Sequence, residues 1–163
     1  MIVCSQSTKA ILSIRDRKSR KCYLDFVDNL QSKTVKQAII RFLNQYPLGI
    51  IKTMTFDRGS EFAQVHHLEN RFNLINYFCD AYCSWQKGSV ENQNKEVRVY
   101  IRKGTNLKDI SLTRLKEIEL LINTKPRDCL DGLSSDDVWF IESRASLHSV
   151  SYTHLTLPTI LLV

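Results

Sequence analysis

Two acidic residues, each close to a glycine and to cations, carry the main chemical signal of the sequence. Asp57 lies in TFDRGSEF, residues 55–62, and Glu91 lies in WQKGSVENQNKEVRVY, residues 85–100, with 33 residues between the two acids. Phosphodiester transfer uses divalent ions that stabilise the attacking and leaving oxygens. Carboxylates are hard oxygen ligands of the kind that Mg²⁺ binds. The pair therefore predicts two ligands of a metal site for cutting DNA.

Each acid is expected at the end or the start of a regular element. Residues 50–56 are rich in β-branched side chains and predict a strand that leads to Asp57. Gly59 follows it and permits the tight turn that would open a cleft. Glu91 is expected to begin a helix, because apolar residues then recur at helical spacing at Val97 and Ile101.

Cations surround Glu91, and they predict contact with a phosphate backbone. The chain has 23 Lys and Arg against 17 Asp and Glu, which gives a net charge of +6. A solvated helix face is the alternative interpretation of such a charge cluster. Next to two candidate metal ligands, contact with DNA is the better interpretation, and it would be salt-dependent and largely blind to sequence. The candidate DNA-binding residues are Lys87, Lys95, Arg98, Arg102 and Lys103.

The region around Glu91 also resembles a known family. YFCDAYCSWQKGSVEN, residues 77–92, and RKGT, residues 102–105, are similar to the insertion-sequence-thirty (IS-thirty) group of bacterial DDE transposases. The resemblance runs from about Ile2 to Phe140. It implies an α/β fold of the ribonuclease H-like (retroviral integrase-like) class, with a mixed sheet flanked by helices.

The resemblance implies a mechanism as well. In an intact relative, three carboxylates hold two Mg²⁺ or Mn²⁺ ions, water cuts the transposon end, and the freed 3′-hydroxyl attacks a second phosphodiester. In this chain Asp57 and Glu91 map onto two of the three carboxylates, as catalytic residues and metal ligands. The implied partners are DNA, as transposon ends and target, and further copies of the chain in a homo-oligomer.

The first carboxylate of the family's triad has no match in this chain. In the family it precedes an Ile-Val pair on the first strand, and the matching pair here is Ile2-Val3, so the resemblance places it just upstream of the first residue. Other acids are weak substitutes, because they occupy predicted turns or point elsewhere. Those considered are Asp16, Asp25, Glu61, Asp80 and Glu96.

Two further departures from the family affect the expected activity. Arg58 stands where relatives usually carry asparagine, and a cation next to Asp57 should repel a divalent ion unless it points away. The helix-turn-helix region that recognises transposon ends in the family has no counterpart in the sequence. The alternatives to an active core are therefore a catalytically dead fragment that binds DNA or inhibits the transposase, and a decayed remnant.

The length of 163 residues fits one domain with a sizeable core. The predicted order is three strands, then a helix, a strand, a helix, a strand, a helix and further helices, which suits a mixed sheet covered by helices. Residues 1–145 are expected to form the catalytic core, without the start of its first strand. The Thr- and Leu-rich residues 146–163 are expected to be a non-native or disordered tail.

Periodicity and capping signals locate several of these elements. Strands are predicted over residues 10–14 and 22–27. A helix is predicted from Ser32 or Thr34 to a point before Pro47, and another after Ser111. Ser134 and Asp137 form a capping-box pattern for a short helix that reaches Arg144.

The remaining signals concern location and thiols. The sequence contains no secretory h-region and no apolar run of transmembrane length, so a cytoplasmic chain without a membrane partner is expected. Five cysteines without a regular framework indicate reduced thiols. Trp85 either packs under the Glu91 helix or stacks on an unpaired DNA end. A zinc site is the less favoured interpretation of His66, His67, Cys79 and Cys83.

Overall fold

Strands and helices alternate along the first part of the chain, and helices alone follow. The computed structural model describes residues 2–3, 8–80 and 88–153. The order of the elements confirms the predicted order. They are β1 (Ile2–Val3), β2 (Ala10–Arg15), β3 (Cys22–Val27), α1 (Ser32–Leu43), β4 (Thr53–Phe56), α2 (Leu68–Phe72), β5 (Ile75–Phe78), α3 (Gly88–Tyr100), α4 (Leu112–Thr124) and α5 (Ser135–Thr153). Short 3₁₀ turns, Ser60–Phe62, Val65–His67 and Asp128–Leu130, lie between them.

The strands form two sheets within the described ranges, and not the single mixed sheet that was expected. β1, β2 and β3 pair in that order and antiparallel, whereas β4 and β5 form a parallel pair. The reason lies in β1, whose two residues pair only with Ile11 and Ala10. Residues 12–15 of β2 have no described strand on the β1 side, so no described strand connects β2 to β4.

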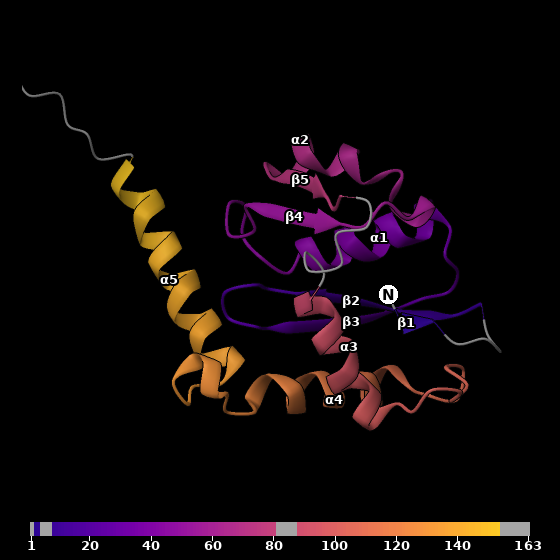
Figure 1. The fold of residues 1–163 in the computed structure, drawn as a ribbon. Helices are drawn as coiled ribbons and strands as arrows, with labels where there is room; N and C mark the ends of the chain where they lie inside the picture. The colour runs from indigo at the N-terminus through magenta and orange to yellow at the C-terminus, as the bar shows by residue number, and fades with distance from the viewer. Residues whose placement is uncertain (1, 4–7, 81–87, 154–163) are drawn as a thin grey trace, which may run out of the picture.

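Helices cover both faces of the antiparallel sheet (Figure 1). α3 and α4 lie on one face, and α1 lies on the other face together with β4 and β5. Alternation along β2 sends Ala10 and Leu12 to the α1 side and Ile11 to the α3 side. Each face therefore has its own apolar cluster. The α1 side includes Val35, Ile39, Phe42, Met54 and Phe56, and the α3 side includes Leu24, Val97, Ile101, Leu115 and Ile118.

Two predicted boundaries in the first half of the chain differ from the structure. β4 begins at Thr53 and not at residue 50, because residues 48–50 form a turn in which Gly49 has a φ of +87°. α1 ends at Leu43, and Tyr46 lies beyond it, with its ring 5.3 Å from that of Phe42. The apolar residues Ile51 and Tyr46, which the sequence pattern assigns to the strand and to the helix, therefore lie in loops and pack against the core.

Polar side chains of α4 cover the outer edge of β3. The Asn123 amide donates from Nδ2 to the Cys22 carbonyl and accepts from the Cys22 N–H, both at 2.8 Å. One step along β3, the Leu24 N–H donates to Glu119 and the Leu24 carbonyl accepts from Lys116. An unpaired strand edge is a template for association with other chains. α4 therefore closes this edge with side chains where another sheet would use a strand.

Replacing Asn123 with alanine is expected to destabilise the fold by about 2 kcal/mol, because it leaves two buried backbone groups of Cys22 without partners. Chemical denaturation monitored by circular dichroism measures the change. Thr113→Ala, on the exposed side of the same helix, is the matched control and should change stability by less than about 0.5 kcal/mol. Equal stability of the Asn123 variant and the wild type would contradict the role given to this side chain.

The capping signals at the two last helices are confirmed. Ser111 accepts a hydrogen bond from the Arg114 N–H at the start of α4. Ser134 Oγ accepts from the Asp137 N–H, and Asp137 accepts from the Ser134 N–H, as a capping box requires. α5 does not end at Arg144 but continues to Thr153, since residues 135–153 contain neither glycine nor proline.

In Figure 1, α5 projects away from the sheets. The side chains of Phe140 and Ile141 on this helix are exposed. Within the ranges that the structure describes, no helix has both the length and the apolar composition needed to cross a membrane.

Candidate metal and nucleic-acid site

A cavity of about 420 Å³ lies between β2 and β4, where the two sheets face one another. Its apolar wall comes from the α1 side and includes Leu12, Ile39 and Phe42. Its polar wall includes Asp57 from the end of β4 and Glu91 from α3. The structure thus brings the two predicted metal ligands to one cavity, although 33 residues separate them in the sequence.

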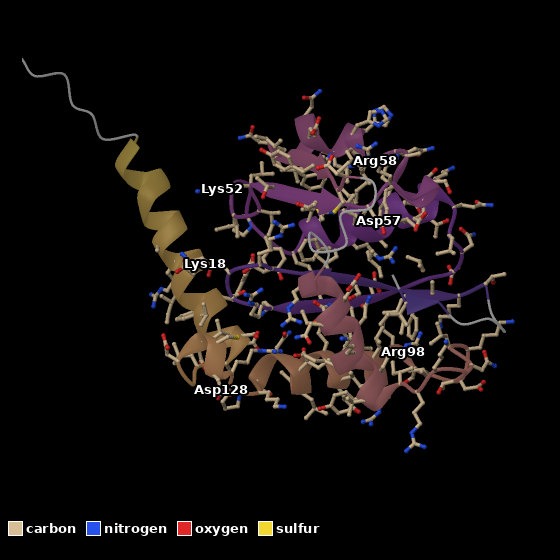
Figure 2. All side chains as sticks on the ribbon, in the orientation of Figure 1. Lys18, Lys52, Asp57, Arg58, Arg98 and Asp128 are labelled. Carbon is tan, nitrogen blue, oxygen red and sulfur yellow. The ribbon has the colours of Figure 1, made fainter. Side chains whose placement is uncertain are left out.

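Asp57 follows the last residue of β4 and is half-buried (Figure 2). The buried side chains of Met54 and Phe56 fix the orientation of the strand that leads to it. The Cys79 N–H donates to the Phe56 carbonyl at 2.8 Å and ties the end of β4 to the end of β5. The carboxylate is therefore placed by a paired and packed strand.

Arg58, next in the chain, is directed away from the cavity. Its Nε donates to the Cys79 carbonyl at 3.1 Å, and its Nη2 lies 3.7 Å from Asp80 Oδ1. Arg58 does not line the cavity that Asp57 and Glu91 share. The guanidinium is turned towards the end of β5, so its repulsion of a divalent ion in the cavity would be weaker than the sequence alone suggested.

Glu91 is an exposed residue in the first turn of α3. The positive end of the helix dipole favours a carboxylate at this position. Beyond the cavity, Glu91 also lines a shallow groove along α3 together with Asn94, Lys95 and Arg98. The groove therefore places a carboxylate and two cations along one side of α3.

The remaining predicted DNA-binding residues do not line the groove that contains Glu91. Arg102 and Lys103 are exposed just after the end of α3. The Arg102 carbonyl accepts a long hydrogen bond of 3.5 Å from Arg98, whose position on the α3 side is labelled in Figure 2. Lys87 and Trp85 lie outside the described residues. The structure therefore groups Lys95 and Arg98 with Glu91, with Arg102 and Lys103 following at the helix end.

Two of the acids considered as substitutes accept hydrogen bonds from neighbouring side chains. Asp16 lines the cavity, but its Oδ2 accepts from the N–H and the hydroxyl of Ser19 in the β2–β3 turn, which confirms it as a turn residue. Asp25 points to the α1 side of the sheet, where its Oδ2 accepts hydrogen bonds from Arg41 Nε and Nη2, and so it points away from the face that Leu24 buries. Within the described residues, no three side chains of His, Cys, Asp or Glu gather as a metal cluster.

The described residues that were considered as zinc ligands lie partly on the surface and partly in the core. His66 and His67 are exposed on the turn before α2, with ring centroids 4.0 Å apart, whereas Cys79 is buried at the end of β5. Cys83 lies outside the described residues. Elsewhere, burial raises the pKa of the Cys22 thiol to about 12, so this cysteine is an unreactive core residue.

An ion cluster next to the cavity was not predicted from the sequence. Glu96 on α3 binds Arg127 with two hydrogen bonds of 2.7 and 3.1 Å, and Arg15 of β2 lies 3.5 Å from the same carboxylate. Burial alone would raise the pKa of Glu96. The hydrogen bond from Arg127 and the charge of Arg15 outweigh burial and hold that pKa below its usual value of 4.5.

The low pKa of Glu96 gives a pH-dependent contribution to stability. A carboxyl whose pKa is lower in the folded state stabilises the fold above its unfolded pKa and loses that contribution as the pH falls through the folded pKa. The stability difference between the wild type and Glu96→Gln should therefore be largest above about pH 5 and shrink below pH 4. Urea denaturation at several pH values measures it. The exposed Glu117→Gln is the control, and a difference that is constant with pH would contradict the assignment.

Comparison with known proteins places the chain among mobile-element proteins. No protein-family model matches it. The transposase for insertion sequence element IS4351 of Bacteroides fragilis is 30% identical over 128 residues, which is 78% of this chain and 39% of that protein. Transposase InsI for element IS30A of Escherichia coli is 32% identical over 131 residues, 79% of this chain and 34% of that protein.

A viral protein is similar as well. The putative integrase ORF3 of Spiroplasma virus SpV1-R8A2 B is 29% identical over 139 residues, 85% of this chain and 43% of that protein. The chain thus spans between 34% and 43% of the length of these three relatives.

Proposed function

This chain belongs to the IS30-type transposases, and from that premise we propose that it forms part of a catalytic core for DNA cleavage and strand transfer with a divalent metal ion. The observation that carries the proposal is the shared cavity of Asp57 and Glu91. Both side chains are carboxylates, they come from separate elements, and the cations of α3 lie beside one of them. This donor set suits phosphodiester chemistry better than nucleophilic catalysis by a side chain.

The described residues fit one hard divalent ion held by two carboxylates. Mg²⁺ and Mn²⁺ accept oxygen ligands, and Asp57, Glu91 and the Asn94 amide supply them at the cavity. When bound, the ion would stabilise the charge that develops on the phosphodiester oxygens. The residues of the chain would hold the two carboxylates at a fixed separation and bind the DNA phosphates on either side of the reacting phosphate.

We assign the phosphate contacts to the groove along α3. Lys95 and Arg98 line it beside Glu91, and Arg102 and Lys103 follow at the end of the helix. Cations in such a row contact the backbone and not the base edges, so binding would be largely independent of sequence. The proposed partner is DNA. Exposed Leu120, Phe140 and Ile141 on α4 and α5 offer apolar surface for a second copy in the proposed homo-oligomer.

The two facing sheets support a ribonuclease H-like fold for the proposed core, residues 1–145, with residues 146–163 outside it. A strand that prolonged β1 on its N-terminal side would lie beside both β2 and β4 and join the sheets. Ile2 faces Ile11, so in this register a position just before the first residue would face Ser13. Ser13 contacts α3 through Gln93, two residues from Glu91. A carboxylate at that position would therefore share the Glu91 side of the sheet, as the family resemblance requires.

Neutralising Lys95, Arg98 and Arg102 together as glutamines is expected to reduce the salt dependence of DNA binding. The slope of log affinity against log salt concentration should fall by about 1 for each phosphate contact that is lost, so by about 2 to 3 in total. Fluorescence anisotropy with a labelled DNA duplex at several salt concentrations measures the slope.

The matched control removes the same charge from another part of the surface. Lys33→Gln, Lys36→Gln and Lys52→Gln change cations of α1 and of the segment before β4, none of which lines the groove. This control should keep most of the slope. If both triple variants lose the same slope, binding follows the net charge of +6 and the groove is not the DNA site.

A further inference from the structure

α3 is attached to the sheet by apolar contacts at and just after its C-terminal end and by polar contacts nearer to Glu91. Val97 and Ile101 are fully or nearly fully buried in the core between the sheet and α4. Nearer to Glu91, Gln93 has an exposed fraction of 0%. Its Nε2 donates to Ser13 Oγ at 2.6 Å and to the Ile14 carbonyl at 3.1 Å. A buried amide thus connects the Glu91 end of α3 to β2.

This amide is not optimised for stability. Gln93 Oε1 is buried and has no hydrogen-bond partner among the described residues. A buried polar atom without a partner costs about 1–3 kcal/mol. An apolar side chain of similar size would avoid that cost but would not bind Ser13. The residue is therefore better explained by the orientation that it imposes on α3 than by its contribution to stability.

One turn later, Glu96 connects the same helix to two further elements. Arg127, which binds Glu96 with two nitrogens, also donates to Ser135 Oγ at the start of α5 and to the Ile122 carbonyl at the end of α4. The Arg15 and Arg127 side chains are only 3% and 10% exposed. A buried ion pair often stabilises no more than apolar residues would, but its directed hydrogen bonds fix a geometry.

We propose that Gln93 and Glu96 are positioning residues that hold the first turn of α3 against β2 and so set the Glu91 carboxylate relative to Asp57 across the cavity. The inference rests on the proposed metal-binding function of Asp57 and Glu91. Groups that orient a metal ligand typically change metal affinity by 10–100-fold when they are removed. Neither residue contacts the ion in this account, and both act through Glu91.

The test measures Mn²⁺ affinity by electron paramagnetic resonance for Gln93→Met and Glu96→Gln, each in the wild-type and in the Glu91→Gln background. In the wild-type background each variant should bind Mn²⁺ about tenfold more weakly. In the Glu91→Gln background neither should weaken binding further, because residues that act through one ligand are not additive with its loss.

Three results separate the possible failures. If Gln93→Met and Glu96→Gln bind Mn²⁺ as the wild type does while Glu91→Gln binds it weakly, the positioning role is wrong and the metal site stands. If Glu91→Gln itself has wild-type affinity, the proposed function fails first. If the variants weaken binding equally in both backgrounds, the effect does not pass through Glu91, which overturns the inference. Glu117→Gln, at an exposed ion pair on α4, is the matched control.

Discussion

Replacing Asp57 or Glu91 with the corresponding amide is expected to lower the affinity for Mn²⁺ at least about tenfold, and replacing both should abolish saturable binding. The amide keeps the size of the side chain but removes its negative charge. Mn²⁺ and Mg²⁺ bind through charged oxygens, and the affinity of a site depends on how many it offers. The cavity holds few such groups, since Asp16 is already bound to Ser19.

The measurement is a titration with Mn²⁺ in which the free ion is counted by electron paramagnetic resonance. Asp128→Asn is the matched control, because Asp128 is exposed and lies outside the cavity (Figure 2). Thermal unfolding of each variant shows that the fold is intact. If Asp128→Asn weakens binding as much as Asp57→Asn does, Mn²⁺ associates with surface charge in general, and the two-carboxylate site does not exist.

Extending the chain before Met1 with a strand-forming segment is expected to stabilise the protein by about 3 kcal/mol, which is about 6–12 °C in Tm for a chain of this size. The segment would prolong β1 between β2 and β4. It would fill the cavity and pair with the inner edges of both strands. Beyond Ile11, the described neighbour of β2 is β3 alone, and the described neighbour of β4 is β5 alone. Burying two apolar side chains would stabilise the fold by about 2 kcal/mol each, and the new backbone hydrogen bonds would add to this. The conformational entropy lost when the segment becomes ordered offsets part of that gain.

The control is a segment of the same composition whose apolar residues point to the opposite face of the sheet. In the register of Ile2 opposite Ile11, the second and fourth added residues share the face of Leu12 and Ile14, which packs towards α1. A segment with valine at those two positions and serine at the first and third should stabilise. The same composition shifted by one residue turns the valines towards Glu91 and should not. Equal Tm values for the two segments would contradict the proposed single sheet.

The sequence predicted individual elements well, because their patterns are local. The alternation of β3 gave both of its bounds, and the capping residues Ser111 and Ser134 gave the starts of the last two helices. Asp57 and Glu91 were chosen from motifs, and the structure places both at one cavity. Their role as metal ligands is still a prediction.

Features that depend on contacts between distant residues were not predicted. Glu96 lies 81 residues from Arg15 and 31 residues from Arg127, and no period or motif connects such positions. The cover that α4 gives to β3 is similar, because Asn123 and Cys22 are 101 residues apart. The separation into two sheets also depends on a long-range condition, which is that the described residues of β1 pair only with Ala10 and Ile11 of β2.

The most direct test of whether Asp57 and Glu91 share a divalent ion is anomalous diffraction from crystals of the chain soaked in Mn²⁺. We expect an anomalous peak between the two carboxylates, at the cavity between β2 and β4. The peak should be absent from crystals of Glu91→Gln. A peak that is confined to other surface acids, or one that persists unchanged in the variant, would contradict the claim.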